Sequence, residues 1–196
     1  MNKKEEILKI ASREFAKYGF TGVSMDAIAK KAGISKAAIY YHFKNKASLF
    51  EEVVMPKVQK LIDEIYSFED KDPKEELKHY IASYAKIFRK YPCFAAVLAH
   101  EFVDGGRDLS DEIIKNLSKV FKKLITILKK GQEKNIFQID NPFSIQLMIV
   151  SSLIMHQTTK NLRKRISKYI EIELNPGIED IANAIYQKIL KAISKE

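Results

Sequence analysis

The segment from Ile34 to Lys46, with the sequence ISKAAIYYHFKNK, concentrates side chains that could bind a nucleic acid. Lys36 and Ala37 would begin a short helix and have little bulk there, so the helix N-terminus can enter a major groove. Lys36 could reach the O6 and N7 atoms of guanine or a phosphate, and Tyr40 could lie on a thymine methyl or donate its hydroxyl to a phosphate. These residue types favour contact with double-stranded DNA, with lysines supplying salt-dependent affinity.

The residues around this helix extend the same chemistry. Tyr41 and His42 would donate hydrogen bonds to oxygens of the DNA backbone. Lys46 would begin the next helix, where its charge and the free backbone N–H groups converge on one phosphate. A packing role is the alternative for each residue taken singly, because tyrosines and histidines often lie half-buried in helical cores. Ile39 and Phe43, however, already fill the inward positions, which leaves the aromatic and basic side chains on the outer face.

Capping residues and apolar periodicity predict the helices that position this face. A first helix should end at Gly19, a second should run from a cap at Ser24 to Gly33, and Ser35 should cap a third over residues 36–43. The spacing of the second and third helices predicts a helix-turn-helix. The first helix should bury a face formed by Ile7, Ile10, Ala11, Phe15 and Tyr18.

The rest of the chain predicts an all-α fold of about nine helices, because no period-two alternation indicates a strand. A fourth helix from Lys46 contains Pro56, which should kink or end it. The run Lys160–Lys168 is interpreted as the solvated end of the eighth helix, where the helix dipole favours cations. The remaining helices should start near Asp72-Pro73, Pro92, Ser110, Asn141-Pro142 and, for the last, after Asn175-Pro176-Gly177.

Charge and composition narrow the function classes. The net charge is +9, and residues 1–46 hold ten Lys/Arg against four Asp/Glu, so this first quarter carries +6 of it. The four histidines and the single Cys93 form no metal-ligand or nucleophile pattern, so no metal, cofactor or catalysis is expected. The stretch Ile145–Met155 is too short and interrupted for a membrane span, and the charged start resembles no secretory signal; a cytoplasmic protein without membrane contact is expected.

The last two long helices predict a homodimer. Apolar residues cover most of the circumference of the eighth helix, so both of its faces must be covered. Pairing of these two helices with the same two of a second copy would form a four-helix interface; a purely internal core is the alternative. The interface residues expected are Met148, Ile181, Ile185 and Ile189.

Residues 19–50, GFTGVSMDAIAKKAGISKAAIYYHFKNKASLF, resemble the DNA-binding domain of the TetR family of bacterial transcriptional regulators. The resemblance covers roughly residues 5–55 and is most specific from Ala27 to Lys46. It implies a helix-turn-helix, a homodimer formed by the last two helices, and a ligand pocket whose occupation moves the fourth helix and releases a palindromic operator. It implies DNA contacts at Thr21, Ser24, Ser35, Lys36, Ala37, Tyr40, Tyr41, His42 and Lys46.

This chain departs from the family pattern at two positions. Many members carry glycine at the position of Ala37 and a hydroxyl residue at that of Ala38, so the backbone approach and the hydrogen bond made there are not carried over.

We expect residues 1–46 to bind DNA and residues 47–196 to bind an effector and dimerise. A regulator without a small-molecule effector, whether constitutive, partner-controlled or an activator, is the alternative.

The expected effector is a hydrophobic or amphipathic small molecule, because the candidate pocket residues are mostly apolar. A plain core is the alternative for each of these aromatic and methionine side chains. The candidates are Tyr80, Tyr84, Phe88, Phe94, His100, Phe102, Phe121, Met148, Met155 and His156.

Overall fold

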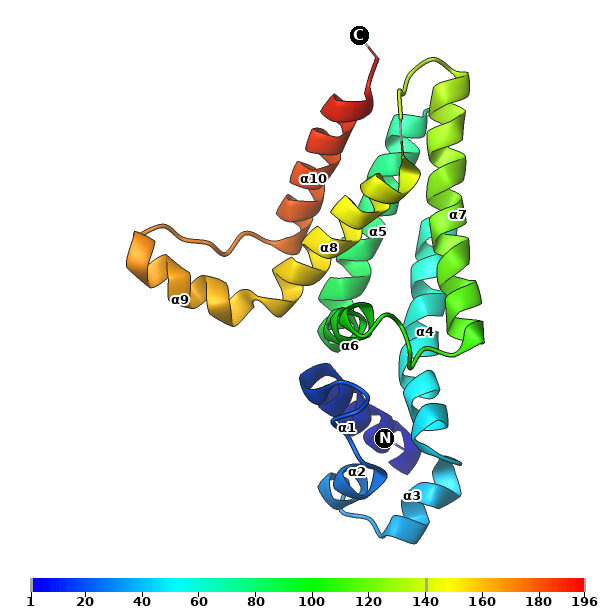
Figure 1. Cartoon of the computed structure of the whole chain (residues 1–196), viewed down its shortest axis with the longest axis vertical. Coiled ribbons are helices and arrows are strands. Elements are labelled where there is room, and N and C mark those ends of the chain that lie inside the picture. Colours follow the sequence, from blue (N-terminus) through cyan, green and yellow to red (C-terminus); the bar gives the residue numbers. More distant parts are fainter. Residues whose placement is uncertain (1, 140, 196) are drawn as a thin grey trace.

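The computed structural model describes residues 2–139 and 141–195, and these residues form ten α-helices (Figure 1). The all-α prediction is confirmed, with one helix more than expected. In chain order the helices are α1 Lys3–Tyr18, α2 Met25–Lys31, α3 Lys36–His42, α4 Lys46–Tyr66, α5 Pro73–Lys90, α6 Pro92–Val103, α7 Asp111–Glu133, α8 Pro142–Thr158, α9 Lys160–Ile170 and α10 Ile178–Ile193.

The first three helices lie at one end of the molecule with the start of α4 (Figure 1). Ser24 and Ser35 begin α2 and α3 as predicted, since each hydroxyl accepts a hydrogen bond from a backbone N–H three residues later, at 3.1 and 3.2 Å. Gly33 has φ of +63° in the turn between them, a conformation that is free of steric cost only without a Cβ. The predicted helix-turn-helix is therefore present.

The first helix differs from the prediction at Tyr18. Phe15 is fully buried, but Tyr18, at the last position of α1, is 45% exposed. Its ring contacts the ammonium groups of Lys17 and Lys31, which lie 4.7 and 5.9 Å from the ring centroid. A tyrosine can pack its ring in this way while its hydroxyl stays in water, so it need not join the buried face.

Pro56 does not end the fourth helix, which runs as one element, Lys46–Tyr66. The proline itself is exposed, whereas Val53, Val54 and Val58 on the adjacent turns are buried. Packing of the turns on both sides offsets the hydrogen bond that the proline removes.

The predicted eighth helix is two helices, because the chain breaks at Thr159. The Thr159 hydroxyl donates to the carbonyl of Met155. The Arg163 guanidinium donates to the carbonyl of His156 and, at 3.0 Å, to that of Leu174, which lies beyond α9. These side chains compete with the helical hydrogen bonds. The basic run expected to end the eighth helix is therefore a separate helix, α9, which has no buried residue and projects from the side of the molecule (Figure 1).

α5 lies at the centre of the C-terminal bundle, where it contacts α4, α7, α8 and α10. The Tyr80 hydroxyl donates to Oε1 of Gln146 at 2.7 Å, and Nε2 of Gln146 donates to the Tyr84 hydroxyl at 2.9 Å. Burial raises the pKa of both phenols, because it disfavours the charged phenolate. This polar network fixes α8 on α5.

Close packing also constrains the end of α7. A Cβ added to Gly131 would lie 1.9 Å from Cδ2 of Phe137, whose side chain is almost completely buried. The absence of a side chain at residue 131 therefore lets the chain turn back over α7.

We expect Gly131→Ala to lower the free energy of unfolding by about 1–3 kcal/mol, the usual cost of overpacking. Helix propensity alone would change this free energy in the opposite direction by about 1 kcal/mol. Urea unfolding followed by circular dichroism measures the sign. The double variant Gly131→Ala/Phe137→Leu should recover part of the loss, and an unchanged or higher midpoint for the single variant would contradict the close contact.

Candidate nucleic-acid interface

The two faces of α3 differ as the sequence predicted. Ile39 and Phe43 are buried, at 0% and 2% exposure, and α3 packs against α2. On the outer face, Tyr40 and Tyr41 are 44% and 87% exposed, and Ala37 is exposed between them and the helix start. The aromatic side chains are thus available to a partner outside the chain.

Lys36 forms a contact that sequence reasoning missed. Its Nζ donates to Oδ2 of Asp26, in the first turn of α2, at 3.0 Å. This hydrogen bond, followed by the Coulombic attraction of the same carboxylate, raises the pKa of Lys36. Asp26 therefore holds the lysine at the start of α3 and competes with any phosphate for it.

Lys46, which we expect to bind a phosphate, also forms contacts within the chain. Its Nζ donates to the carbonyls of Phe20 and Val23 at 2.9 and 3.0 Å, and it lies 4.1 Å from the centroid of the Phe20 ring. Two of its three N–H donors are therefore used inside the chain. Asn45 caps α4 and takes the N–H of Ser48, which leaves only the first backbone N–H groups of this helix for an anion.

The expected hydroxyl contacts lie at helix starts. Ser24 and Ser35 use an oxygen lone pair for capping, which leaves each hydroxyl hydrogen free to donate outward. Thr21 is exposed in the turn before α2. Tyr41 and His42 lie edge to face, with ring centroids 5.4 Å apart. All nine predicted DNA contacts thus belong to the same end of the molecule, which presents mainly donors.

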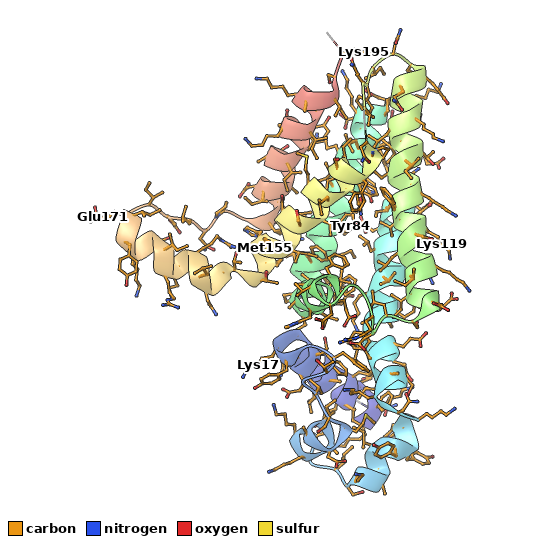
Figure 2. The ribbon with its side chains drawn as sticks, in the orientation of Figure 1. Lys17, Tyr84, Lys119, Met155, Glu171 and Lys195 are labelled. Carbon is orange, nitrogen blue, oxygen red and sulfur yellow. The ribbon has the colours of Figure 1, made fainter. Side chains whose placement is uncertain are left out.

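The predicted pocket residues do not surround one cavity. Tyr84, Phe88 and Phe94 form an edge-to-face series in the buried core, with centroids 5.8 and 6.0 Å apart. Met148 and Met155 are 48% and 57% exposed on α8. Figure 2 shows Tyr84 inside the bundle and Met155 farther along α8, near α9. Helical periodicity could not separate core positions from cavity positions.

The two histidines of the predicted pocket join other parts of the fold. Nε2 of His156 lies 2.9 Å from the carbonyl of Pro176, in the segment before α10. His100 lies beside the end of α1, where a Cβ on Gly19 would be 3.4 Å from its Nδ1 atom. The two histidines thus lie beside the segment before α10 and the end of α1.

A groove of about 420 Å³ is present at a different place, between the α6–α7 turn, α7 and α8. Of the residues predicted to line a pocket, only Phe102 lines this groove. Phe121 is not part of the lining but contacts Phe143, which is, with ring centroids 6.3 Å apart. Leu109 and Ile114 complete one mostly apolar wall. Sequence reasoning missed these residues because they come from three separate elements.

The predicted dimer residues also differ in exposure. Met148 is exposed, and Ile181 and Ile185 are partly buried, so all three retain surface for a partner. Ile189 is 1% exposed and belongs to the internal core, so it retains almost no surface for a partner.

Within the described residues, no group of three or more His, Cys, Asp or Glu side chains is arranged to hold a metal ion. No described helix combines the length and the apolar character that crossing a membrane requires.

Comparison with known proteins gives family matches for two consecutive stretches of the chain. Residues 7–53 match the bacterial regulatory proteins of the tetR family, and residues 55–152 match the C-terminal region of YcdC-like proteins. The HTH-type transcriptional regulator RutR of Escherichia coli K12 is 31% identical over 116 residues, which cover 59% of this chain and 55% of RutR. The HTH-type transcriptional repressor NicS of Pseudomonas putida is 26% identical over 185 residues, 87% of this chain and 82% of NicS.

The chain spans about half the length, or less, of the first curated relatives that it matches, 36% of one and 55–56% of others. Among solved structures, the ketosteroid transcriptional regulator KstR2 of Mycobacterium tuberculosis aligns with a TM-score of 0.74 at 18% identity, over 100% of this chain and 96% of KstR2. That likeness shows a common fold. With the helix-turn-helix and the two family matches, the chain belongs to the TetR family of bacterial transcriptional regulators.

Proposed function

We propose that this regulator is a repressor that binds a palindromic operator as a homodimer and is released by a small hydrophobic or amphipathic effector. Residues 1–46 would bind DNA, and residues 47–196 would bind the effector and form the dimer. The observation that carries the proposal is the outer face of α3, where Lys36, Ala37 and Tyr40 are exposed while the opposite face is buried.

The geometry of α3 supports contact with a major groove. The helix begins with small or flexible side chains and has the Ser35 hydroxyl at its start, so its first turn can approach base edges. Tyr41, His42 and the first N–H groups of α4 would bind phosphates on either side. Lys36 would exchange Asp26 for a phosphate or a guanine, since both groups of this pair are exposed.

A homodimer is supported by apolar side chains that remain exposed on α8 and α10. Met148 and Met155 are about half-exposed on α8, and Ile181 and Ile185 retain surface on α10. The two helices contact each other, so apolar side chains of both could contribute to one interface. Repression is supported by NicS, a relative described as a repressor that aligns with most of this chain.

The groove between α6, α7 and α8 is the proposed effector site. Its apolar walls suit a hydrophobic body, and Gln146 and Ser151 offer polar groups at the α8 side. Phe102 and the turn after it line the groove, whereas His100, earlier on α6, contacts the end of α1. An effector that displaces α6 would therefore displace the DNA-binding end.

A regulator without an effector is the second candidate. It is favoured by the packing of Tyr84, Phe88 and Phe94, which fill the interior of the bundle where a deep pocket was expected.

The proposal is tested by binding of the protein, at about 150 mM salt, to DNA from upstream of its own gene and to scrambled DNA of equal length. Specific recognition predicts a preference of roughly a thousandfold for the upstream DNA. Equal binding to both would show only a basic surface, and absence of binding to either would contradict DNA recognition.

Lys36→Gln should reduce the slope of log K against log salt by about one, because one ammonium–phosphate contact is removed. Asp26→Asn is the matched control, since it removes the internal competitor and should strengthen DNA binding. Fluorescence anisotropy at several salt concentrations measures both. An unchanged slope for Lys36→Gln would exclude Lys36 from the phosphate contacts.

The protein should sediment at twice 22.6 kDa at micromolar concentration, and Ile185→Glu should shift it to a monomer, because an unpaired carboxylate would be buried between subunits. Gln187→Glu adds the same charge on the exposed side of α10 and should remain dimeric. A wild-type monomer, or a dimer that tolerates Ile185→Glu, would contradict the interface.

Ile114→Trp should fill the groove without changing DNA affinity, because Ile114 is 45% exposed at its wall. For a hydrophobic compound that releases the wild-type protein from DNA, the concentration needed to release this variant should be at least about tenfold higher, which corresponds to a loss of about 1.4 kcal/mol in binding free energy. Ile172→Trp, on an exposed residue outside the groove, is the control. Equal release of all three proteins would place the effector elsewhere.

A further inference from the structure

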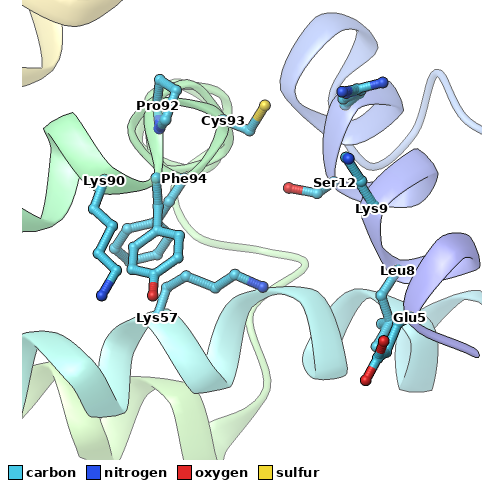
Figure 3. A pocket seen from close by; sticks show the side chains of 11 residues that line it. Glu5, Leu8, Lys9, Ser12, Lys57, Lys90, Pro92, Cys93 and Phe94 are labelled. Atoms are coloured by element: carbon cyan, nitrogen blue, oxygen red, sulfur yellow. The ribbon is translucent and has the colours of Figure 1, made fainter. Parts of the chain in front are cut away.

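A second hollow, of about 600 Å³, lies between the DNA-binding end and the C-terminal bundle (Figure 3). Its walls come from α1, α4 and the junction of α5 with α6, and it shares no lining residue with the groove proposed for the effector. Four cationic side chains line it, Lys9, Arg13, Lys57 and Lys90, against one carboxylate, that of Glu5.

The positive charge of this cleft is not neutralised within the described part of the chain. None of the four cationic side chains forms an ion pair there. Glu5 is engaged in the capping box of α1, where its carboxylate accepts from the N–H of Asn2 at 3.3 Å. Burial, and then repulsion by Lys60, lower the pKa of Lys57, so its ammonium lies where an anion would stabilise it.

The N-terminus of α6 adds to this potential. No side chain caps α6, and its first residues, Pro92–Phe94, line the cleft with the positive end of the helix dipole. Figure 3 shows Lys57 extending between α4 and α6, with Ser12 on α1 across from it. Leu8 and Tyr91 contribute apolar surface beside these polar groups.

We propose that this cleft binds an anionic amphiphile, a carboxylate or phosphate on an apolar body. The anionic group lies near the Lys57 ammonium, with Lys9 and Arg13 on the opposite wall, and the apolar body lies against Leu8 and Tyr91. Binding requires only the cleft and does not depend on the proposed function. Its regulatory consequence does, because such a ligand would join α1 to α4 and α6 and change the position of the DNA-binding end.

Cys93 provides a reporter at the site, because it is the only cysteine of the chain and lines the cleft. The experiment measures the rate at which neutral iodoacetamide alkylates Cys93 in the full chain, with increasing decanoate below its micelle concentration. Decan-1-ol has the same apolar body without the charge. Decanoate at about ten times its dissociation constant should slow alkylation by about tenfold, because the bound ligand covers Cys93, and decan-1-ol should have little effect.

Three variants separate charge from folding. Arg13→Gln changes an exposed side chain, Lys57→Met keeps the length and the apolar stem, and both should lose most of the protection by decanoate. Lys60→Met, next to the cleft but not in its lining, should keep it. Three outcomes would overturn the proposal. Decanoate and decan-1-ol could protect Cys93 equally, the protection by decanoate could survive in both cleft variants, or decanoate could fail to protect the wild-type protein. DNA binding is not measured, so failure here leaves the proposed function unaffected.

Discussion

The packing of α1 against α4 and α6 fixes the position of the helix-turn-helix relative to the C-terminal bundle. Phe15 packs edge to face on Phe50 of α4, with ring centroids 5.0 Å apart and planes at 89°. At the end of the same helix, Gly19 has φ of +68° and lies beside His100 of α6, whose Nδ1 atom would be 3.4 Å from an added Cβ. The helix-turn-helix is thus attached to α4 and α6 through a packed helix. Close packing transmits a displacement that a flexible linker would absorb.

Much of the fold could be predicted because its determinants are local. Ser24, Gly33 and Ser35 fix the starts and turns of the second and third helices through hydrogen bonds within a few residues and one left-handed conformation. The break at Thr159 could not be predicted, because it depends on Arg163 reaching a carbonyl that α9 brings within range only after folding. Pro56 failed as a helix terminator for a similar reason, since tertiary packing of the adjacent turns outweighs the local preference.

The sequence could predict which face of α3 is exposed, but it could not predict the individual side-chain contacts of that face. Spacing alone placed Ile39 inward and Tyr40 outward, as the structure has them. The Asp26–Lys36 pair joins residues ten positions apart on different helices, and the two carbonyls bound by Lys46 lie more than twenty positions earlier. Such contacts follow from the crossing of helices. For the same reason, aromatic periodicity identified the residues of the C-terminal core without showing where that core leaves an opening.

The position of α6 explains how two separate openings can act on one DNA-binding end. The apolar groove borders its C-terminal end at Phe102, and the cationic cleft borders its N-terminal end at Pro92–Phe94. α1 contacts the same twelve-residue helix. A ligand at either end would change the packing of one short element, so the two proposed sites would need no direct contact to be coupled. The two proposed ligands differ in chemistry, because one opening is nearly uncharged and the other is lined by cations that form no ion pair within the described residues. Each ligand would therefore act through the same helix without competing for the same site.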